Sequence, residues 1–114
     1  MEKHLFYYYY FLFVCLFVLG VMTADQIWPN KDAVVIKEDE TVALSCSYTS
    51  SGYAYLYWYR QYPNKELQYL IYSAQSSSGR FRVTKSQTST ELTITGVTLS
   101  DSALYYCALR VAAQ

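Results

Sequence analysis

The sequence predicts an all-β protein that folds as an antiparallel sandwich of two sheets. Beyond residue 24, apolar and polar side chains alternate with a spacing of two, and Thr, Val, Tyr and Ser dominate, a composition typical of strands. Two cysteines, Cys46 and Cys107, lie in such alternating segments, and Trp58 lies between them. Each cysteine shares its strand face with small or apolar residues, so both are expected to point inward. This arrangement is typical of a sandwich whose two sheets are joined by a central disulfide.

Residues 1–24 are expected to be a secretory signal peptide. A short polar start precedes an uncharged, mainly apolar run over residues 5–22, and the small residues Thr23 and Ala24 follow. The alternative is a membrane anchor, because an apolar run of about 18 residues is close to spanning length. Cleavage near Thr23 or Ala24 would remove Cys15 and leave an even pair of cysteines in an oxidising compartment.

Residues 25–114 are expected to form one domain of short strands separated by turn residues. The first strand, 27–36, is interrupted at Pro29, which cannot donate to a ladder and therefore marks an edge strand or a kink. Residues 98–102 are expected to form a corner that can hold a helical turn. The other strands are expected over residues 41–48, 55–62, 67–72, 80–85, 90–95 and 103–109.

The inward-pointing positions of these strands define the expected core around the disulfide. On the chain-entropy model a cross-link of this span stabilises the fold by about 4 kcal/mol, and a core of this modest size would depend on that contribution. The expected core residues are Val42, Leu44, Leu56, Trp58, Phe81, Val83, Leu92, Ile94, Ala103 and Tyr105.

The segment that leads into Cys107 carries two features of a folded corner. Tyr105, two residues before the cysteine, matches a tyrosine corner, in which the hydroxyl bonds to upstream backbone. Asp101 lies at the same corner and needs a cationic partner if it is buried. We expect that partner to be Arg80, whose planar donors suit a two-pronged pair with a carboxylate.

Three strands are expected to carry an unusually apolar and aromatic outer face, although exposed strand faces normally carry charged and small polar groups. A monomer rarely exposes so large an apolar patch, and tyrosine enrichment is typical of interfaces. We therefore expect this face to pack on another domain; the alternative is a second buried face within one domain. Its expected members are Tyr57, Tyr59, Gln61, Leu67, Tyr69, Ile71, Leu104 and Tyr106.

Two loops, over residues 49–54 and 73–78, combine small polar residues with tyrosine or glutamine. Adaptable polar groups beside rigid tyrosine are typical of antibody-like binding loops. Ordinary solvated loops can have the same composition, so composition alone leaves both interpretations open.

The sequence offers no catalytic, cofactor or metal chemistry that we can identify. The formal net charge is zero, with no basic stripe suited to nucleic acid. The only histidine, His4, lies in the expected signal peptide, so a histidine-based catalyst or zinc site is not expected in the mature protein. Glycine-rich phosphate loops and paired carboxylates in a recognisable setting are absent, and both mature cysteines are assigned to the disulfide.

Several motifs resemble the variable domains of antigen receptors. They are Trp-Tyr-Arg-Gln-Tyr-Pro at 58–63, Gly-Arg-Phe at 79–81, Asp-Ser-Ala-x-Tyr-x-Cys at 101–107 and Ala-Leu-Arg at 108–110. The chain is most similar to a T-cell receptor alpha variable segment, with the delta chain as a near relative. The resemblance covers 25–110 and implies an immunoglobulin V-type antiparallel β-sandwich.

The resemblance also implies roles for individual residues. Cys46 and Cys107 would form the intersheet disulfide over Trp58. The partner variable domain, from a beta or gamma chain, would pack on Tyr59, Gln61, Leu67 and Tyr106. Hypervariable loops would contact peptide presented by a major histocompatibility molecule through Ser51, Gly52, Tyr53, Tyr55, Ser73, Gln75, Ser76, Leu109 and Arg110.

The chain departs from the family pattern after Arg110. A complete variable domain continues into a final strand with a Phe-Gly-x-Gly motif, whereas this sequence stops at residues 111–114. The resemblance then implies a sandwich that lacks its final strand, an unpaired edge on the last strand and an incomplete third loop. We expect the isolated segment 25–114 to be marginally stable or prone to aggregation because that edge is open.

The sequence therefore predicts a non-enzymatic antigen-recognition domain, half of a heterodimer at the extracellular side of the plasma membrane. Signalling would run through separate chains and through regions outside this segment. Two alternatives remain: a secreted immunoglobulin light-chain variable segment, and an innate or adhesion receptor with a standalone V-type domain.

Overall fold

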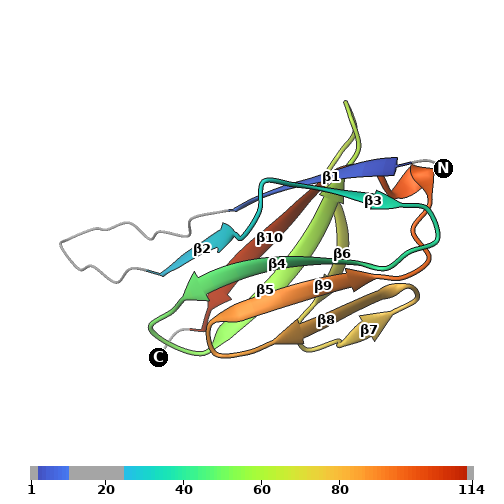
Figure 1. Cartoon of the computed structure of the whole chain (residues 1–114). Helices are drawn as coiled ribbons and strands as arrows, with labels where there is room; N and C mark the ends of the chain where they lie inside the picture. The colour runs from blue at the N-terminus through green and yellow to red at the C-terminus, as the bar shows by residue number, and fades with distance from the viewer. Residues whose placement is uncertain (1–2, 11–24, 113–114) are drawn as a thin grey trace.

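The computed structural model describes residues 3–10 and 25–112, and it confirms the all-β sandwich. The expected cleavage point near Thr23 or Ala24, and Cys15, lie outside the described residues. Ten strands and one 3₁₀ turn make up the described residues (Figure 1). In chain order they are β1 Lys3–Tyr10, β2 Gln26–Pro29, β3 Ala33–Lys37, β4 Val42–Thr49, β5 Ala54–Gln61, β6 Gln68–Tyr72, β7 Ser77–Ser78, β8 Phe81–Lys85, β9 Ser89–Ile94, η1 Leu99–Asp101 and β10 Leu104–Val111.

The strands form two five-stranded sheets. One has the order β3-β1-β10-β5-β6, and the other has the order β2-β4-β9-β8-β7. The interruption expected at Pro29 is the place where the chain leaves one sheet for the other, because β2 pairs with β4 whereas β3 pairs with β1. The side chain of Asn30 fixes this crossing: its Nδ2 donates to Ser45 Oγ at 2.7 Å, and its Oδ1 accepts from Ser47 Oγ at 2.8 Å.

The expectation of an unpaired edge on the last strand is wrong for the chain as described. Lys3–Tyr10, from the expected signal peptide, forms β1 between β10 and β3, parallel to the former and antiparallel to the latter. This stretch contains four consecutive tyrosines, which favour strands. The unpaired N–H and C=O groups of an edge strand accept such a segment. The instability expected of 25–114 alone stays a prediction, since removing β1 would expose both neighbouring edges.

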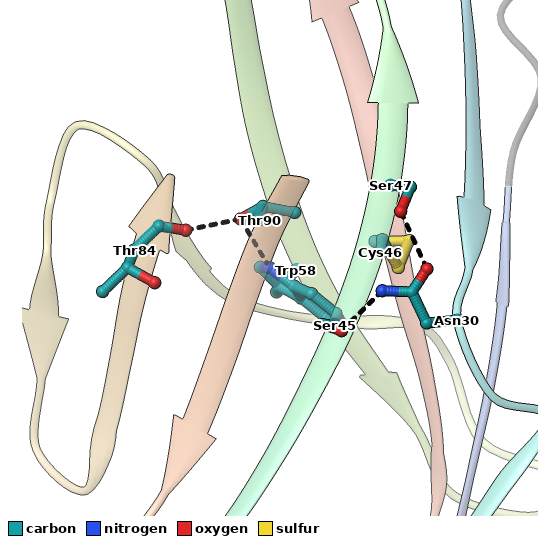
Figure 2. The surroundings of a disulfide bond; sticks show 8 residues. Asn30, Ser45, Cys46, Ser47, Trp58, Thr84 and Thr90 are labelled. Atoms are coloured by element: carbon teal, nitrogen blue, oxygen red, sulfur yellow. Dashed lines mark hydrogen bonds between the residues drawn. A yellow bond between two sulfur atoms is a disulfide. The ribbon is translucent and has the colours of Figure 1, made fainter. Parts of the chain in front are cut away.

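The disulfide Cys46–Cys107 joins β4 of one sheet to β10 of the other, with a Cα–Cα distance of 6.7 Å (Figure 2). Trp58 on β5 is fully buried and lies directly opposite Cys107 in the strand register. Its indole Nε1 donates to Thr90 Oγ1 at 3.4 Å, and that hydroxyl donates to the Thr84 carbonyl at 2.9 Å. The buried polar atoms beside the disulfide are thereby hydrogen-bonded, as a dry core requires.

Most of the expected core is buried, with Phe81 only partly so. The core also contains buried side chains that were not predicted from strand alternation: Ile27, Tyr48, Ala54, Ile71, Val97 and Leu109. Ile71 is a correction, because it was placed on the outer face. The β5–β6 register shifts between Trp58 and Tyr59, so that Trp58 pairs with Ile71 and Tyr59 pairs with Tyr69. A bulge inserts an extra residue and reverses the alternation beyond it, which turns Ile71 inward.

Candidate binding surfaces

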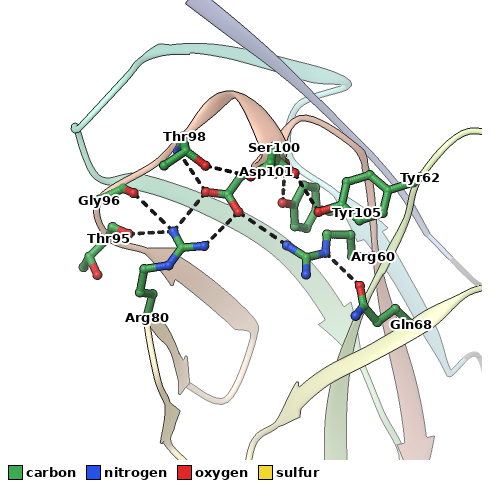
Figure 3. A network of polar contacts seen from close by, with 10 residues as sticks. All are labelled: Arg60, Tyr62, Gln68, Arg80, Thr95, Gly96, Thr98, Ser100, Asp101 and Tyr105. Atoms are coloured by element: carbon green, nitrogen blue, oxygen red, sulfur yellow. Dashed lines mark hydrogen bonds and ion pairs between the residues drawn. The ribbon is translucent and has the colours of Figure 1, made fainter.

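The corner at η1, at one end of the sandwich, holds a network of polar groups that are paired with one another (Figure 3). The Asp101 side chain is only 2% exposed. Arg80 donates two hydrogen bonds to this carboxylate, Nη1 to Oδ2 and Nη2 to Oδ1, both at 2.9 Å. Arg60 Nη1 approaches Oδ1 at 3.4 Å, and the Thr98 backbone N–H donates to Oδ2 at 2.9 Å. The hydroxyl of buried Tyr105 donates to the Asp101 carbonyl at 2.5 Å.

Local backbone structure delivers these groups to the corner. Gly79 has φ +61°, a left-handed conformation that glycine adopts freely, and it turns the chain from β7 into β8 so that Arg80 precedes the strand. Arg80 Nη1 also donates to the carbonyls of Thr95 and Gly96, at 3.0 and 3.2 Å. The carboxylate of Asp101 in turn caps the start of η1 through Thr98.

The ionisation of Asp101 reflects these contacts. Burial opposes the charged form, but hydrogen bonds from Arg80 and Thr98 and the charges of both arginines lower its pKa below the usual value. The hydrogen bond with Asp101 raises the pKa of Arg80, and burial raises the pKa of Tyr105. Asp101 therefore stays ionised as the shared anion of two cations, in a structural role.

The contribution of Arg60 was not predicted from the sequence, although a signal was present. Leu56, Trp58 and Arg60 alternate along β5 on its inward side, so a cation at the third position requires a buried anion. Its guanidinium also lies over the rings of Tyr62 and Phe81, at 5.1 and 5.5 Å from their centroids.

The outer face of β5, β6 and β10 carries an aromatic stripe, which we define as Tyr57, Tyr59, Tyr69, Tyr72 and Tyr106. Tyr57 and Tyr72 stack with centroids 5.1 Å apart, and Tyr59 and Tyr69 meet edge to face at 5.9 Å. Tyr69 is 47% exposed. The other four rings are half-buried, so the stripe is partly exposed on the described molecule.

The four residues expected at a partner interface lie on or beside this stripe. The Tyr106 hydroxyl donates to Gln61 Oε1 at 2.9 Å, and Gln61 Nε2 donates to the Lys65 carbonyl at 3.0 Å. This fixes the glutamine amide at the end of the stripe near the β5–β6 turn. Leu67, 46% exposed, precedes β6, and Tyr59 is partly buried.

The first expected binding loop, between β4 and β5, is held by local hydrogen bonds. Asp25 Oδ1 accepts from the Ser51 backbone N–H at 2.7 Å, and Ser50 Oγ donates to the Gly52 carbonyl at 2.8 Å. Tyr53 projects from this loop and is 60% exposed. Between this loop and the β8–β9 turn lies an open cleft of about 600 Å³ whose lining includes Tyr53, Lys85 and Ser86.

The second expected loop, between β6 and β7, is exposed over most of its length, including Gln75 and Ser76. Gln75 Oε1 accepts from the Tyr72 backbone N–H at 3.1 Å and also accepts from the Tyr69 hydroxyl. Ser73 is partly buried, because its hydroxyl accepts from the Leu56 N–H at 3.2 Å. The loop is thereby tied to the aromatic stripe.

The two residues expected from the third loop separate. Leu109 is fully buried within β10 and lies opposite Leu56 in the register, which corrects its expected place on a contacting loop. Arg110, the next residue, is exposed because strand alternation turns it to the outer face. Its guanidinium carbon lies 4.4 Å from the centroid of Tyr55, and its Nε donates to the Tyr57 hydroxyl at 3.1 Å.

The described residues contain no group of three His, Cys, Asp or Glu side chains placed to hold a metal ion. Within the same residues, no helix has the length and apolar character needed to cross a membrane. The described residues offer surfaces instead. An aromatic stripe lies on the outer face of β5, β6 and β10, and the loops lie at the end opposite η1 (Figure 1).

Comparison with known proteins identifies the family of this chain. The model of the immunoglobulin V-set domain matches residues 30–114. Human T cell receptor alpha variable 3 is 37% identical over 102 residues, which cover 83% of this chain and 90% of that protein. The chain belongs to the T cell receptor alpha variable family. It is thus an antigen-recognition variable domain of a T cell receptor alpha or delta chain, from a family of non-enzymatic receptor domains.

Two further relatives define the extent of the match. Human T cell receptor alpha variable 14/delta variable 4 is 34% identical over 100 residues, with 81% of this chain and 86% of the relative covered. Human T cell receptor alpha chain MC.7.G5 is 36% identical over 97 residues, which are 78% of this chain but 35% of that protein. These T cell receptor relatives favour the receptor interpretation over the light-chain and adhesion-receptor alternatives.

Proposed function

We propose that this variable domain forms half of a receptor heterodimer with the variable domain of a beta or gamma chain, on the extracellular side of the plasma membrane. The aromatic stripe carries the proposal, because it is partly exposed and membership of the family provides a partner domain to cover it. Tyr59, Gln61, Leu67 and Tyr106 are the proposed contacts. The Gln61 amide, fixed by Tyr106, is presented to the partner without being free to rotate.

We propose further that the loop end contacts peptide presented by a major histocompatibility molecule. The residues assigned to this contact are the exposed or half-buried members of the set that the resemblance implies. They are Ser51, Gly52, Tyr53, Tyr55, Ser73, Gln75, Ser76 and Arg110. Leu109 is withdrawn from this set because it is part of the core.

Pairing is tested by joining the chain to a final strand and constant region and coexpressing it with a beta chain in a cell line without its own receptor. Leu67→Asp and Tyr106→Ala should reduce surface receptor, because the first introduces an unpaired charge and the second removes the glutamine's partner. Arg82→Gln on β8, in the other sheet, is the matched control. Normal surface receptor in both variants would refute this interface.

Residues 1–24 are proposed to be removed during secretion. The N-terminal residue of the mature surface chain, read by mass spectrometry, tests this. A mature chain that retains Lys3–Tyr10 would refute removal.

A further inference from the structure

At the loop end, two cations bracket a pair of exposed or half-buried tyrosines. Lys85 Nζ lies 3.9 Å from the ring centroid of Tyr53. Tyr53 meets Tyr55 edge to face at 5.0 Å, and Arg110 lies over the other tyrosine at 4.4 Å. The order Lys85, Tyr53, Tyr55, Arg110 thus forms a continuous array that runs from the cleft beside the first loop to the start of the third.

Arg110 is oriented by contacts that use one of its five N–H donors. One face of the guanidinium rests on Tyr55, and Nε donates to the Tyr57 hydroxyl. Tyr57 is itself held by stacking on Tyr72. The terminal nitrogens Nη1 and Nη2 donate to no residue that the structure describes. A guanidinium with these two nitrogens free and its plane fixed matches the two oxygens of a carboxylate.

The charge balance around the array also indicates a site for an anion. Neither Arg110 nor Lys85 has a carboxylate within ion-pair distance in residues 25–112. Asp25 is the nearby loop anion, and it already accepts from the N–H and hydroxyl of Ser51. The hydrogen bond with Tyr57 raises the pKa of Arg110 further, so the cation is permanent. The array therefore presents positive charge on aromatic supports with no internal neutralising anion.

We propose that Arg110 is a preformed carboxylate-binding residue, and that its occupant is an acidic side chain of the presented peptide, with Lys85 strengthening the attraction. This inference rests on the proposed function for the source of the carboxylate. Arg110 lies on β10 and its supports Tyr55 and Tyr57 lie on the neighbouring strand β5, which places the site where the first loop meets the start of the third. Tyr57 acts as a positioning residue through its hydroxyl.

The first experiment tests carboxylate binding without any receptor partner. The full chain, refolded with its disulfide and labelled with ¹⁵N at arginine, is titrated with acetyl-Gly-Glu-Gly-amide or acetyl-Gly-Gln-Gly-amide. The Arg110 Nε–H resonance should shift with the glutamate peptide, which should bind about threefold to tenfold more tightly than the glutamine peptide. Raising the salt concentration should reduce this preference, since the contact is exposed.

Matched variants separate the site from general positive charge. With ¹⁵N at lysine as well, the Lys85 Nζ resonance should show that Arg110→Gln loses most of the preference for the glutamate peptide, leaving only the weaker attraction of Lys85. Arg110→Lys should keep part of the preference through charge attraction alone. Tyr57→Phe should lower the preference because Nε loses its anchor, whereas Arg82→Gln should leave it unchanged. Equal binding of the two peptides, or an unchanged preference in Arg110→Gln, would overturn the proposal.

The second experiment identifies the source of the carboxylate in the complete receptor. Peptides are selected from a randomised library displayed on a major histocompatibility molecule, and Glu→Gln or Asp→Asn peptides are combined with Arg110→Gln. Each single change should weaken binding about threefold to tenfold, and the two together should weaken it little further. Coupling instead to an acidic residue of the presenting molecule or of the partner variable domain would overturn the assignment to the peptide.

The two experiments also separate this inference from the proposed function. Selected peptides that bind without coupling to Arg110 would support the function and overturn the inference. Carboxylate binding in the first experiment, with no presented peptide recognised in the second, would overturn the proposed function and with it the peptide as source.

Discussion

Arg80 and Arg110 place the same chemical group at opposite ends of one sandwich and use it differently. The terminal nitrogens of Arg80 donate hydrogen bonds to Asp101 and to two backbone carbonyls. In Arg110, Nε donates to Tyr57 and one face of the guanidinium lies on Tyr55, while the terminal nitrogens donate to no described residue. The lesson is that saturation of the donor set, more than exposure, distinguishes an arginine that holds the fold from one available to a ligand. Arg80 itself is 44% exposed and is structural nonetheless.

The largest expected effect on stability comes from a change in the η1 corner, where Asp101 pairs with Arg60 and Arg80. Asp101→Ala leaves Arg60 and Arg80 without their anion and removes the cap of η1, and removing one partner of a buried pair costs about 3 kcal/mol or more. Urea denaturation of the joined variable domain should therefore show a markedly lower midpoint with an unchanged slope. Arg110→Gln, which removes a charge from the surface at the loop end, is the control. A midpoint close to that of the unaltered domain in Asp101→Ala would contradict the structural role.

A smaller effect is expected from Tyr105→Phe. The change removes the hydroxyl that donates to the Asp101 carbonyl and leaves that buried acceptor without this bond, at a cost of about 1 to 2 kcal/mol. The same urea titration measures it. Tyr57→Phe, which removes a hydroxyl at the loop end, should leave the midpoint in place; equal losses in both variants would remove the distinction between the two ends.

Acid should weaken the η1 corner selectively. The pKa of Asp101 is lowered in the folded state, so the unfolded chain takes up the proton first as pH falls. The contribution of this group is present above the unfolded aspartate pKa of about 4 and is lost as pH falls through the lower folded value. Asp101→Asn should flatten the dependence of the free energy of unfolding on pH in this window. An equally steep dependence in that variant would show that other carboxylates control acid unfolding.

The smallest expected effect on stability comes from Arg110→Gln, because the side chain is exposed and makes no ion pair with the described residues. The thermal midpoint should not change measurably, whereas binding of acidic peptides should fall. A clear loss of stability would make Arg110 a structural residue like Arg80.

Much of the fold could be predicted from the sequence because strand alternation is a local property. The parity of Val42, Leu44 and Cys46 suffices to place them inside, and the chemistry of Asp101 suffices to demand a cation. The family comparison then gives the sandwich a function. The pattern of motifs around Trp58 and Cys107 carried that resemblance.

The remaining features depend on how different segments of the chain pair with one another, which the alternation within a single strand does not reveal. The bulge that turns Ile71 inward is a mismatch between two strands, so neither strand reveals it alone. Leu109 was assigned to a contacting loop by the resemblance, although the expected strand 103–109 already included it; β10 runs on to Val111 and keeps it in the core. The pairing of β1 with β10 depends on an edge left open elsewhere in the chain.

The position of the disulfide determines how the binding loops respond to proteolysis. Cys46 and Cys107 are 61 residues apart, and both the β4–β5 and β6–β7 loops lie between them. A protease that cuts either loop therefore leaves a single covalent molecule, and the two fragments separate on a gel only after reduction. A cut after Arg110 lies outside this ring and releases the end of the chain at once. Comparing reduced with unreduced samples would thus show which loops a protease reaches first.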